Sequence, residues 1–206
     1  VVPYLAYARQ DRIFLPSETV SIETVARMLK AAGVDDLITV NIHQANALTT
    51  FPFPAKNLSA ISLLAEYFRD RGHLKAFALA PDKGAIYIAE EARKVLGGEC
   101  GYLEKQRDRY TGQVSMKEKT FDVEGKSVIV FDDIISSGGT IVAASNVLKQ
   151  LGAAEIYVAC VHPLLVGDAE RRIMDAGARE IVGTDTIPSN VSKVSVAPII
   201  CKELAH

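Results

Sequence analysis

Short apolar runs and helix-like segments alternate along almost the whole of this 206-residue chain, and this alternation constrains the fold more than any other feature. The apolar runs expected to be strands lie at residues 37–42, 76–80, 99–103, 128–131, 156–161 and 180–184. The segments expected to be helices lie at residues 59–71, 86–96, 140–151 and 168–176. Such alternation is typical of a parallel sheet covered by helices on both faces, so we predict a doubly wound α/β fold.

The two ends of the chain extend this pattern. Residues 1–7 are apolar enough for a strand, and Ser21 is expected to cap a helix that ends at Gly33. A last strand is expected near residues 193–196, before a terminal helix from Pro198.

The expected domain organisation follows from where these elements gather. The Pro-rich residues 51–54 are the best linker candidate. We expect residues 1–56 to be the remainder of an N-terminal half and residues 57–196 to form a C-terminal domain. The terminal helix at 197–206 is expected to pack on the first half. Because residues 1–56 hold too few elements to close a layered core, we expect further structure to precede residue 1.

Composition excludes several classes of protein. The formal net charge is −2, so no basic field attracts nucleic acid, and no apolar run is long enough to span a bilayer. The three cysteines, Cys100, Cys160 and Cys201, are far apart and odd in number, as expected of thiols in a reducing compartment rather than a disulfide framework. We therefore expect a cytoplasmic protein that binds neither nucleic acid nor membrane.

The chemistry of the chain is concentrated in residues 128–140. An apolar strand leads into the adjacent carboxylates Asp132 and Asp133. The turn that follows is rich in hydroxyl groups and glycine: Ser136, Ser137, Gly138, Gly139 and Thr140. Glycine lets backbone N–H groups close around a phosphate, and the start of a helix adds partial positive charge. The two acids would repel phosphate alone but suit sugar hydroxyls, so the expected ligand is a phosphorylated sugar. The alternative is an ordinary turn between strand and helix.

This stretch resembles the ribose-5-phosphate loop shared by type I phosphoribosyltransferases and ribose-phosphate pyrophosphokinases. Other segments, taken in order, extend the resemblance to the second family along essentially the whole chain. The first is Tyr7-Ala-Arg-Gln-Asp-Arg12, which matches the family's ATP-binding stretch. The resemblance implies ATP contacts for Arg9, Gln10 and Arg12. Without it, the same residues could form a solvated loop.

Two further positions match metal ligands of that family. His43 falls where the family has a histidine that holds Mg²⁺ with the nucleotide, and Asp82 falls on its second metal ligand. A lone histidine at a strand end is otherwise more often bonded to backbone, and Pro81-Asp82 is otherwise a plain turn. The chain departs from the family at Asn41 and Lys56, where acidic residues are usual.

The catalytic candidates are Lys105 and Arg107, in a charged stretch from 104 to 119 that lacks apolar periodicity. A charge run is usually a solvated face. The resemblance instead implies a flexible loop that closes over the phosphates. In that loop Lys105 stabilises charge on the transferred group, and Arg107 holds the phosphates of the sugar or nucleotide.

The resemblance implies a fold of phosphoribosyltransferase type, with two related halves of which the first is incomplete. It also implies Mg²⁺-dependent transfer of pyrophosphate from ATP to ribose 5-phosphate by a homo-oligomeric enzyme. Two alternatives stay open, a type I phosphoribosyltransferase and a noncatalytic regulatory subunit. Because a segment before residue 1 would contribute to the adenine pocket, we expect residues 1–206 alone to bind ribose 5-phosphate better than ATP.

Overall fold

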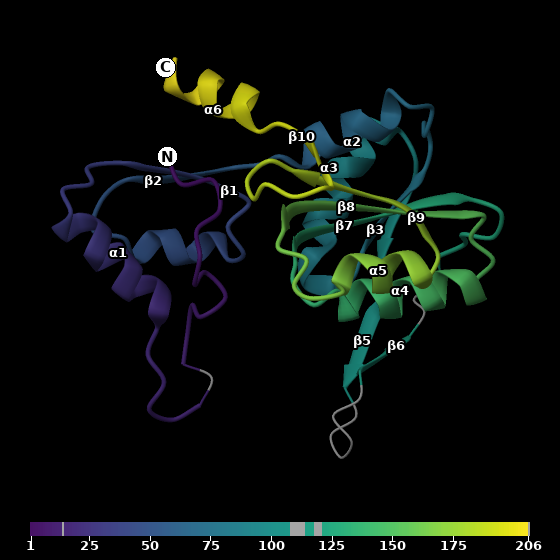
Figure 1. Ribbon diagram of the computed structural model, residues 1–206, viewed down its shortest axis with the longest axis horizontal. Coiled ribbons are helices and arrows are strands. Elements are labelled where there is room, and N and C mark those ends of the chain that lie inside the picture. Colours follow the sequence, from purple (N-terminus) through teal and green to yellow (C-terminus); the bar gives the residue numbers. More distant parts are fainter. Residues whose placement is uncertain (14, 108–113, 118–120, 206) are drawn as a thin grey trace. The chain divides into compact units, whose positions relative to one another are not determined.

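The computed structural model describes residues 1–13, 15–107, 114–117 and 121–205, with only the backbone of residues 105–107 and 114–117 (Figure 1). The chain divides into two compact units. The first comprises Val1–Ala60 with Val196–His206, and the second comprises Ile61–Ser195.

A six-stranded parallel sheet forms the centre of the second unit, in the order β10-β9-β8-β7-β3-β4. Its strands are β3 (Phe77–Ala80), β4 (Cys100–Tyr102), β7 (Ser127–Ile135), β8 (Glu155–Pro163), β9 (Ala178–Thr184) and β10 (Ser192–Val194). The central strands β3, β7 and β8 are almost entirely buried and apolar, as expected of a parallel sheet covered on both faces. The predicted doubly wound α/β fold is confirmed.

Helices cover both faces of this sheet. They are α2 (Ile61–Arg69), α3 (Ile86–Leu96), α4 (Gly139–Gln150) and α5 (Ala169–Asp175). Figure 1 shows α2 and α3 on one face and α4 and α5 on the other. The helices pack through buried apolar stripes, for example Ile141, Ala144 and Leu148 of α4.

The order of the strands creates a switch point between β3 and β7. From β3 the chain adds β4 on one side, whereas from β7 it adds β8, β9 and β10 on the other. Ligands of open α/β sheets bind in the crevice beyond the carboxyl ends of the strands at such a point. The fold therefore directs attention to the residues that end β3 and β7.

The charged stretch after Leu103 contains two strands that the sequence did not indicate. Strand β5 (Glu104–Arg107) pairs antiparallel with β6 (Val114–Lys117). Leu103 and Val123, on either side of this hairpin, are buried in the core of the second unit. Part of the charged stretch therefore pairs as strands, which its lack of apolar periodicity did not indicate.

The first unit is smaller. It contains α1 (Ser21–Ala31), β1 (Leu37–Val40), the 3₁₀ helix η1 (Ala45–Thr50), β2 (Ala55–Leu58) and α6 (Ala197–Leu204). Strands β1 and β2 are parallel, and their core includes Leu5, Ile22, Leu37, Phe51 and Phe53. An ion pair between Lys56 of β2 and Glu203 of α6 joins the terminal helix to this unit.

Two sequence expectations about the first unit are wrong, and one strand of this unit was not expected. Residues 1–7 form no strand, although Val2 and Pro3 run beside β1 through two hydrogen bonds, Val2 N to Ile38 O at 2.9 Å and Val40 N to Pro3 O at 3.0 Å. Ser21 is the first residue of α1 rather than its N-cap, and Val20 occupies that place without a side-chain hydrogen bond. The unexpected strand is β2, which directly follows the Pro-rich stretch.

Within the described part of the chain, no helix is long and apolar enough to cross a membrane.

Candidate functional site

The glycine- and hydroxyl-rich turn connects β7 to α4 at the carboxyl end of the sheet. Its carbonyl groups fix its path, because Ser136 O accepts from Val166 N at 3.0 Å and Ser137 O accepts from Arg172 Nη1 at 3.4 Å. The first N–H groups of α4, from Gly139 onward, have no partner within the helix. The start of α4 therefore has the donors and the partial positive charge that suit a phosphate.

Gly138 is required at the N-cap of α4 for two reasons. Its backbone is left-handed, with φ of 76°, a conformation that side chains disfavour. A Cβ on this residue would also lie 3.1 Å from Ile173 Cδ1 and 3.5 Å from Ala169 Cβ of α5. The turn can approach α5 this closely only because residue 138 is glycine.

The two adjacent acids lie inside β7, which continues to Ile135, beyond the predicted end at residue 131. Asp133 is buried at 7% exposure, and Asp132 is half-buried and accepts a hydrogen bond from Asp133 N at 3.0 Å. Burial raises the pKa of the Asp132 carboxyl well above its usual range, and the neighbouring Asp133 and Asp82 carboxylates raise it further. This site therefore carries excess negative charge that a cation or a set of hydroxyl donors would relieve.

Asp82 lies across the switch point from this pair, directly after β3. Its Oδ1 accepts hydrogen bonds from Gly84 N at 2.8 Å and Ala85 N at 3.2 Å, which caps the short 3₁₀ helix η2 (Lys83–Ala85). The capping explains the Asp-Lys-Gly sequence as a local turn. The electrostatic effect of Asp82 on Asp132 also places the two acids in one site.

Tyr87 is a member of this site that the sequence did not indicate. It lies in the first turn of α3, and half of its surface is exposed. Partial burial raises its pKa to about 12, and the Asp133, Asp132 and Asp82 carboxylates contribute to the shift. Its phenol is therefore a hydrogen-bond donor at neutral pH beside three acids. Its place in the helix that follows Pro81-Asp82 is the only signal in the sequence.

Lys105 and Arg107 lie in the β5–β6 hairpin of the same unit. Backbone pairing places Lys105 opposite Met116 and Arg107 opposite Val114. The positions of their side chains lie outside the described part of the structure.

The candidate ATP-binding residues belong to the first unit. Arg9 and Arg12 are exposed, and Tyr7 precedes them in a left-handed conformation with φ of 68°. The Gln10 side chain donates to Arg12 O and to Glu18 Oε2, each at 3.2 Å, so its amide helps to fold this loop.

His43 is an exposed residue beyond β1 in the same unit. The nearby Asn41 is buried at 5% exposure, and its Oδ1 accepts from Ala60 N at 2.7 Å. Asn57 makes a matching bond, with its Oδ1 accepting from Ile42 N at 2.9 Å. The amide at 41 therefore joins the ends of β1 and β2, and Lys56 forms the ion pair with Glu203. Both departures from the family's acidic residues have structural roles here.

Within the described residues, no cluster of three or more His, Cys, Asp or Glu side chains is arranged to enclose a metal ion. Magnesium usually keeps several waters and needs only one or two carboxylates. The acids at the switch point satisfy that smaller requirement.

Comparison with known proteins agrees with this geometry. Residues 1–33 match the family model described as the N-terminal domain of ribose phosphate pyrophosphokinase, and residues 114–204 match the phosphoribosyl synthetase-associated domain. The chain is 46% identical to a ribose-phosphate pyrophosphokinase of Methanothermobacter thermautotrophicus over 97% of its length and 69% of the relative's. It is 42% identical to ribose-phosphate pyrophosphokinase 2 of Archaeoglobus fulgidus, over 99% of this chain and 73% of the relative.

A solved structure gives the same result at the level of the fold. Phosphoribosylpyrophosphate synthetase from Mycobacterium smegmatis aligns with a TM-score of 0.85 and 30% identity, over 98% of this chain and 68% of that one. Sequence, fold and the site at the switch point therefore agree, and the chain belongs to the ribose-phosphate pyrophosphokinase family.

Proposed function

We propose that this chain transfers the pyrophosphoryl group of ATP to the C1 hydroxyl of ribose 5-phosphate, giving 5-phosphoribosyl 1-pyrophosphate and AMP. In this reaction the C1 oxygen forms a bond to the β-phosphorus of ATP. The bond between that phosphorus and the oxygen bridging to the α-phosphate breaks, AMP leaves, and the hydroxyl proton is lost to solvent. The activity is the one for which the chain's relatives are named.

A single observation supports the sugar-phosphate part of this proposal most strongly. One strand, β7, carries two adjacent acids and leads directly into a glycine-rich helix start beside the switch point. The turn formed by Ser136, Ser137, Gly138, Gly139 and Thr140 would bind the 5-phosphate. Asp132 and Asp133 would accept hydrogen bonds from the ribose hydroxyls. A phosphate and a polyol within one small molecule satisfy both groups of residues.

We propose that Arg9, Gln10, Arg12 and His43 bind ATP and that Asp82, with His43, holds Mg²⁺. Burial raises the pKa of Asp132, and the nearby Asp133 and Asp82 carboxylates raise it further, so a cation bound here would relieve the repulsion between these acids. When bound, Mg²⁺ would neutralise phosphate charge during transfer. The residues of the chain would position the sugar hydroxyl and hold the ribose phosphate.

Lys105 and Arg107 are the proposed catalytic residues. Lys105 would stabilise charge on the transferred group, and Arg107 would hold phosphate oxygens bidentately. As in other phosphoryl transfers, most of the rate enhancement would come from positioning and charge neutralisation. The hairpin would also exclude water, whose attack on ATP would compete with the sugar. We also propose that the protein forms a homo-oligomer and is located in the cytoplasm.

AMP release from Mg-ATP, measured with and without ribose 5-phosphate, tests the assignment. We expect AMP to depend on the sugar, and Lys105→Ala to lower turnover about 100-fold, the cost of one preorganised donor. Lys94→Ala, at an exposed lysine in the last turn of α3, is the matched control and should keep full activity.

Two other results would replace the proposal. Base-dependent release of pyrophosphate from 5-phosphoribosyl 1-pyrophosphate would indicate a phosphoribosyltransferase instead. Normal binding of both substrates without sugar-dependent AMP would indicate a noncatalytic regulatory subunit.

A further inference from the structure

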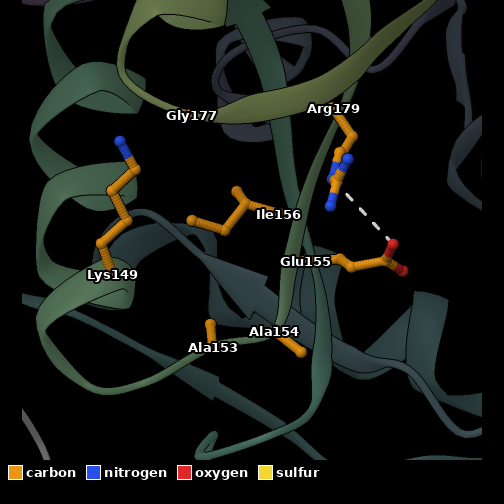
Figure 2. Close-up of a pocket in the computed structure, with 7 residues that line it drawn as sticks. All are labelled: Lys149, Ala153, Ala154, Glu155, Ile156, Gly177 and Arg179. Carbon is orange, nitrogen blue, oxygen red and sulfur yellow. Dashed lines mark ion pairs between the residues drawn. The ribbon is translucent and has the colours of Figure 1, made fainter.

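A second candidate site lies at the amino end of the same sheet, where β8 and β9 begin. It is a pocket of about 370 Å³ at the opposite ends of the strands from the sugar-phosphate turn (Figure 2). The residues that line it are Lys149, Ala153, Ala154, Glu155, Ile156, Gly177 and Arg179. None of them belongs to the site at the switch point.

Two cationic side chains flank the pocket. Figure 2 shows Lys149, from the last turn of α4, and Arg179, from β9, on opposite sides with Ile156 between them. Arg179 Nε lies 3.9 Å from Glu155 Oε1, beyond the range of a normal N–H···O hydrogen bond. Within the described residues, no hydrogen bond or ion pair engages the Lys149 amino group. Both cations therefore have donors available for a ligand.

The Lys149 side chain passes close to the backbone of Gly177. Gly177 has a left-handed φ of 104°, and a Cβ built on it would overlap Lys149 Cε and lie 2.7 Å from Lys149 Nζ. The lysine side chain therefore lies directly over a glycine Cα, in space that any other residue at 177 would fill. Glycine at position 177 therefore leaves room for the lysine side chain beside the pocket.

Apolar surface forms the rest of the lining, contributed by Ala153, Ala154 and Ile156. The volume falls within the range of small-molecule sites, roughly 300–1,000 Å³, and exceeds the needs of a bare inorganic anion. The charged lining has two cations and one carboxylate, an excess of one positive charge. The chemistry therefore suits a ligand with both an acidic group and an apolar body.

We propose that this pocket binds a small organic anion, either a carboxylate or a phosphate monoester. Its acidic group lies between Lys149 and Arg179, and its apolar body covers Ile156 and Ala153. Arg179 recognises the acidic group through parallel N–H donors and Lys149 through a single charge. The site is independent of the proposed transfer reaction.

Backbone amide NMR titration of the full chain tests this site with four probes. Benzoate and phenyl phosphate combine an acid with a ring, inorganic phosphate lacks the ring, and benzyl alcohol lacks the charge. We expect the first two to shift the amides of residues 153–156 and 177–179. Inorganic phosphate and benzyl alcohol should bind at least about tenfold more weakly, because each loses one of the two interactions. The order of benzoate and phenyl phosphate identifies the preferred acidic group.

Variants separate this site from nonspecific attraction to a charged surface. Lys149→Met and Arg179→Gln remove the positive charge but keep the inner part of each side chain, and each should weaken benzoate binding at least about tenfold, the worth of one charge-assisted contact. Lys94→Met removes an exposed lysine outside the pocket and should leave the affinity for benzoate unchanged. The proposal is overturned if benzoate shifts none of these amides at millimolar concentration, if benzyl alcohol binds as tightly, or if both variants keep wild-type affinity. Shifts at residues 136–140 report the sugar-phosphate turn, so failure of one site is distinguishable from failure of the other.

Discussion

The two ends of the parallel sheet in the second unit differ in how far their charged side chains are exposed to solvent. At the carboxyl end, Asp133 is buried and Asp132 is half-buried, and the Asp132 pKa is raised well above its usual range by burial and by like charge. At the amino end, Glu155 and Arg179 form a long ion pair with side chains 40% and 64% exposed. The acids at the carboxyl end therefore repel one another in a partly buried site, whereas solvent screens the charges at the amino end. Unfavourable charge of this kind is typical of functional sites, where a ligand supplies the missing compensation.

Helix α4 spans both ends and offers the largest test of this difference. It starts after Gly138 and is followed by Gly152, and both glycines have φ of 76°. Gly138→Ala would strain the backbone and meet Ile173 at 3.1 Å, so ribose 5-phosphate affinity should fall at least about tenfold. Gly152→Ala places a Cβ beside Glu124, at 3.2 Å from the flexible Cγ and at an ordinary van der Waals distance of 3.7 Å from Cα. It should cost on the order of 1 kcal/mol of stability through backbone strain but leave binding within about twofold.

Isothermal titration calorimetry with ribose 5-phosphate, together with urea unfolding, measures both effects. Equal loss of affinity in the two variants would show that α4 transmits strain along its length. The carboxyl end would then have no special role in binding.

The second test removes the charge of Asp132, which burial and the neighbouring acids make unfavourable in the folded protein. Because the folded-state pKa of Asp132 is raised, the folded protein binds a proton more tightly than the unfolded chain does. Stability should therefore fall as pH rises from the unfolded pKa of about 4 through the folded pKa. Asp132→Asn removes this dependence, so the variant should be more stable than wild type at neutral pH and lose that advantage near pH 4.

The same substitution should weaken binding while it stabilises the fold. Losing a carboxylate acceptor for a sugar hydroxyl should lower ribose 5-phosphate affinity about tenfold at neutral pH. Urea unfolding at several pH values in Mg²⁺-free buffer, with calorimetry of the sugar phosphate, checks both parts. A variant that is less stable than wild type at neutral pH would contradict the interpretation that the charge of Asp132 destabilises the folded protein.

The carboxyl end could be predicted from sequence because its chemistry is contiguous. Asp132, Asp133 and the turn from Ser136 to Thr140 lie within one strand–turn–helix segment, and alternation of strands and helices places such a segment at the end of a sheet. The amino-end pocket could not be predicted, because Lys149, Glu155 and Arg179 come from separate elements and form no motif. The parallel pairing of β8 and β9 brings Glu155 and Arg179 together, and the end of α4 adds Lys149.

The other misses have local causes. Tyr87 has no pattern of its own, because a sequence does not specify which residue of a first helical turn lies near a neighbouring strand. Strand β5, with the sequence Glu-Lys-Gln-Arg, has no apolar residue, and the alternation of apolar and polar residues in β6 extends over only four residues. Strand β2, with the sequence Ala-Lys-Asn-Leu, is only four residues long and half polar, so its parallel partner β1 defines it.

A pair of tyrosines offers a smaller test. The Tyr87 phenol lies near the acids of the carboxyl end, and the Tyr157 hydroxyl donates to Glu155 Oε2 at 3.2 Å at the amino end. Tyr87→Phe removes a neutral donor worth about 1 kcal/mol and should weaken ribose 5-phosphate binding a few-fold. Tyr157→Phe should leave that affinity unchanged. Equal affinities for wild type and Tyr87→Phe would remove Tyr87 from the site.

The smallest effect is expected from Glu155→Gln, the amino-end counterpart of Asp132→Asn. Glu155 is 40% exposed and its partner Arg179 is 64% exposed, so solvent screens the charge in both the folded and the unfolded protein. We expect the free energy of unfolding to change by less than about 0.5 kcal/mol. Urea unfolding of both variants under the same conditions makes the comparison direct. The contrary outcome is that Glu155→Gln stabilises the fold as much as Asp132→Asn does. Solvent exposure would then not explain the difference between the two ends of the sheet, and the destabilising charge of Asp132 would no longer indicate a functional site.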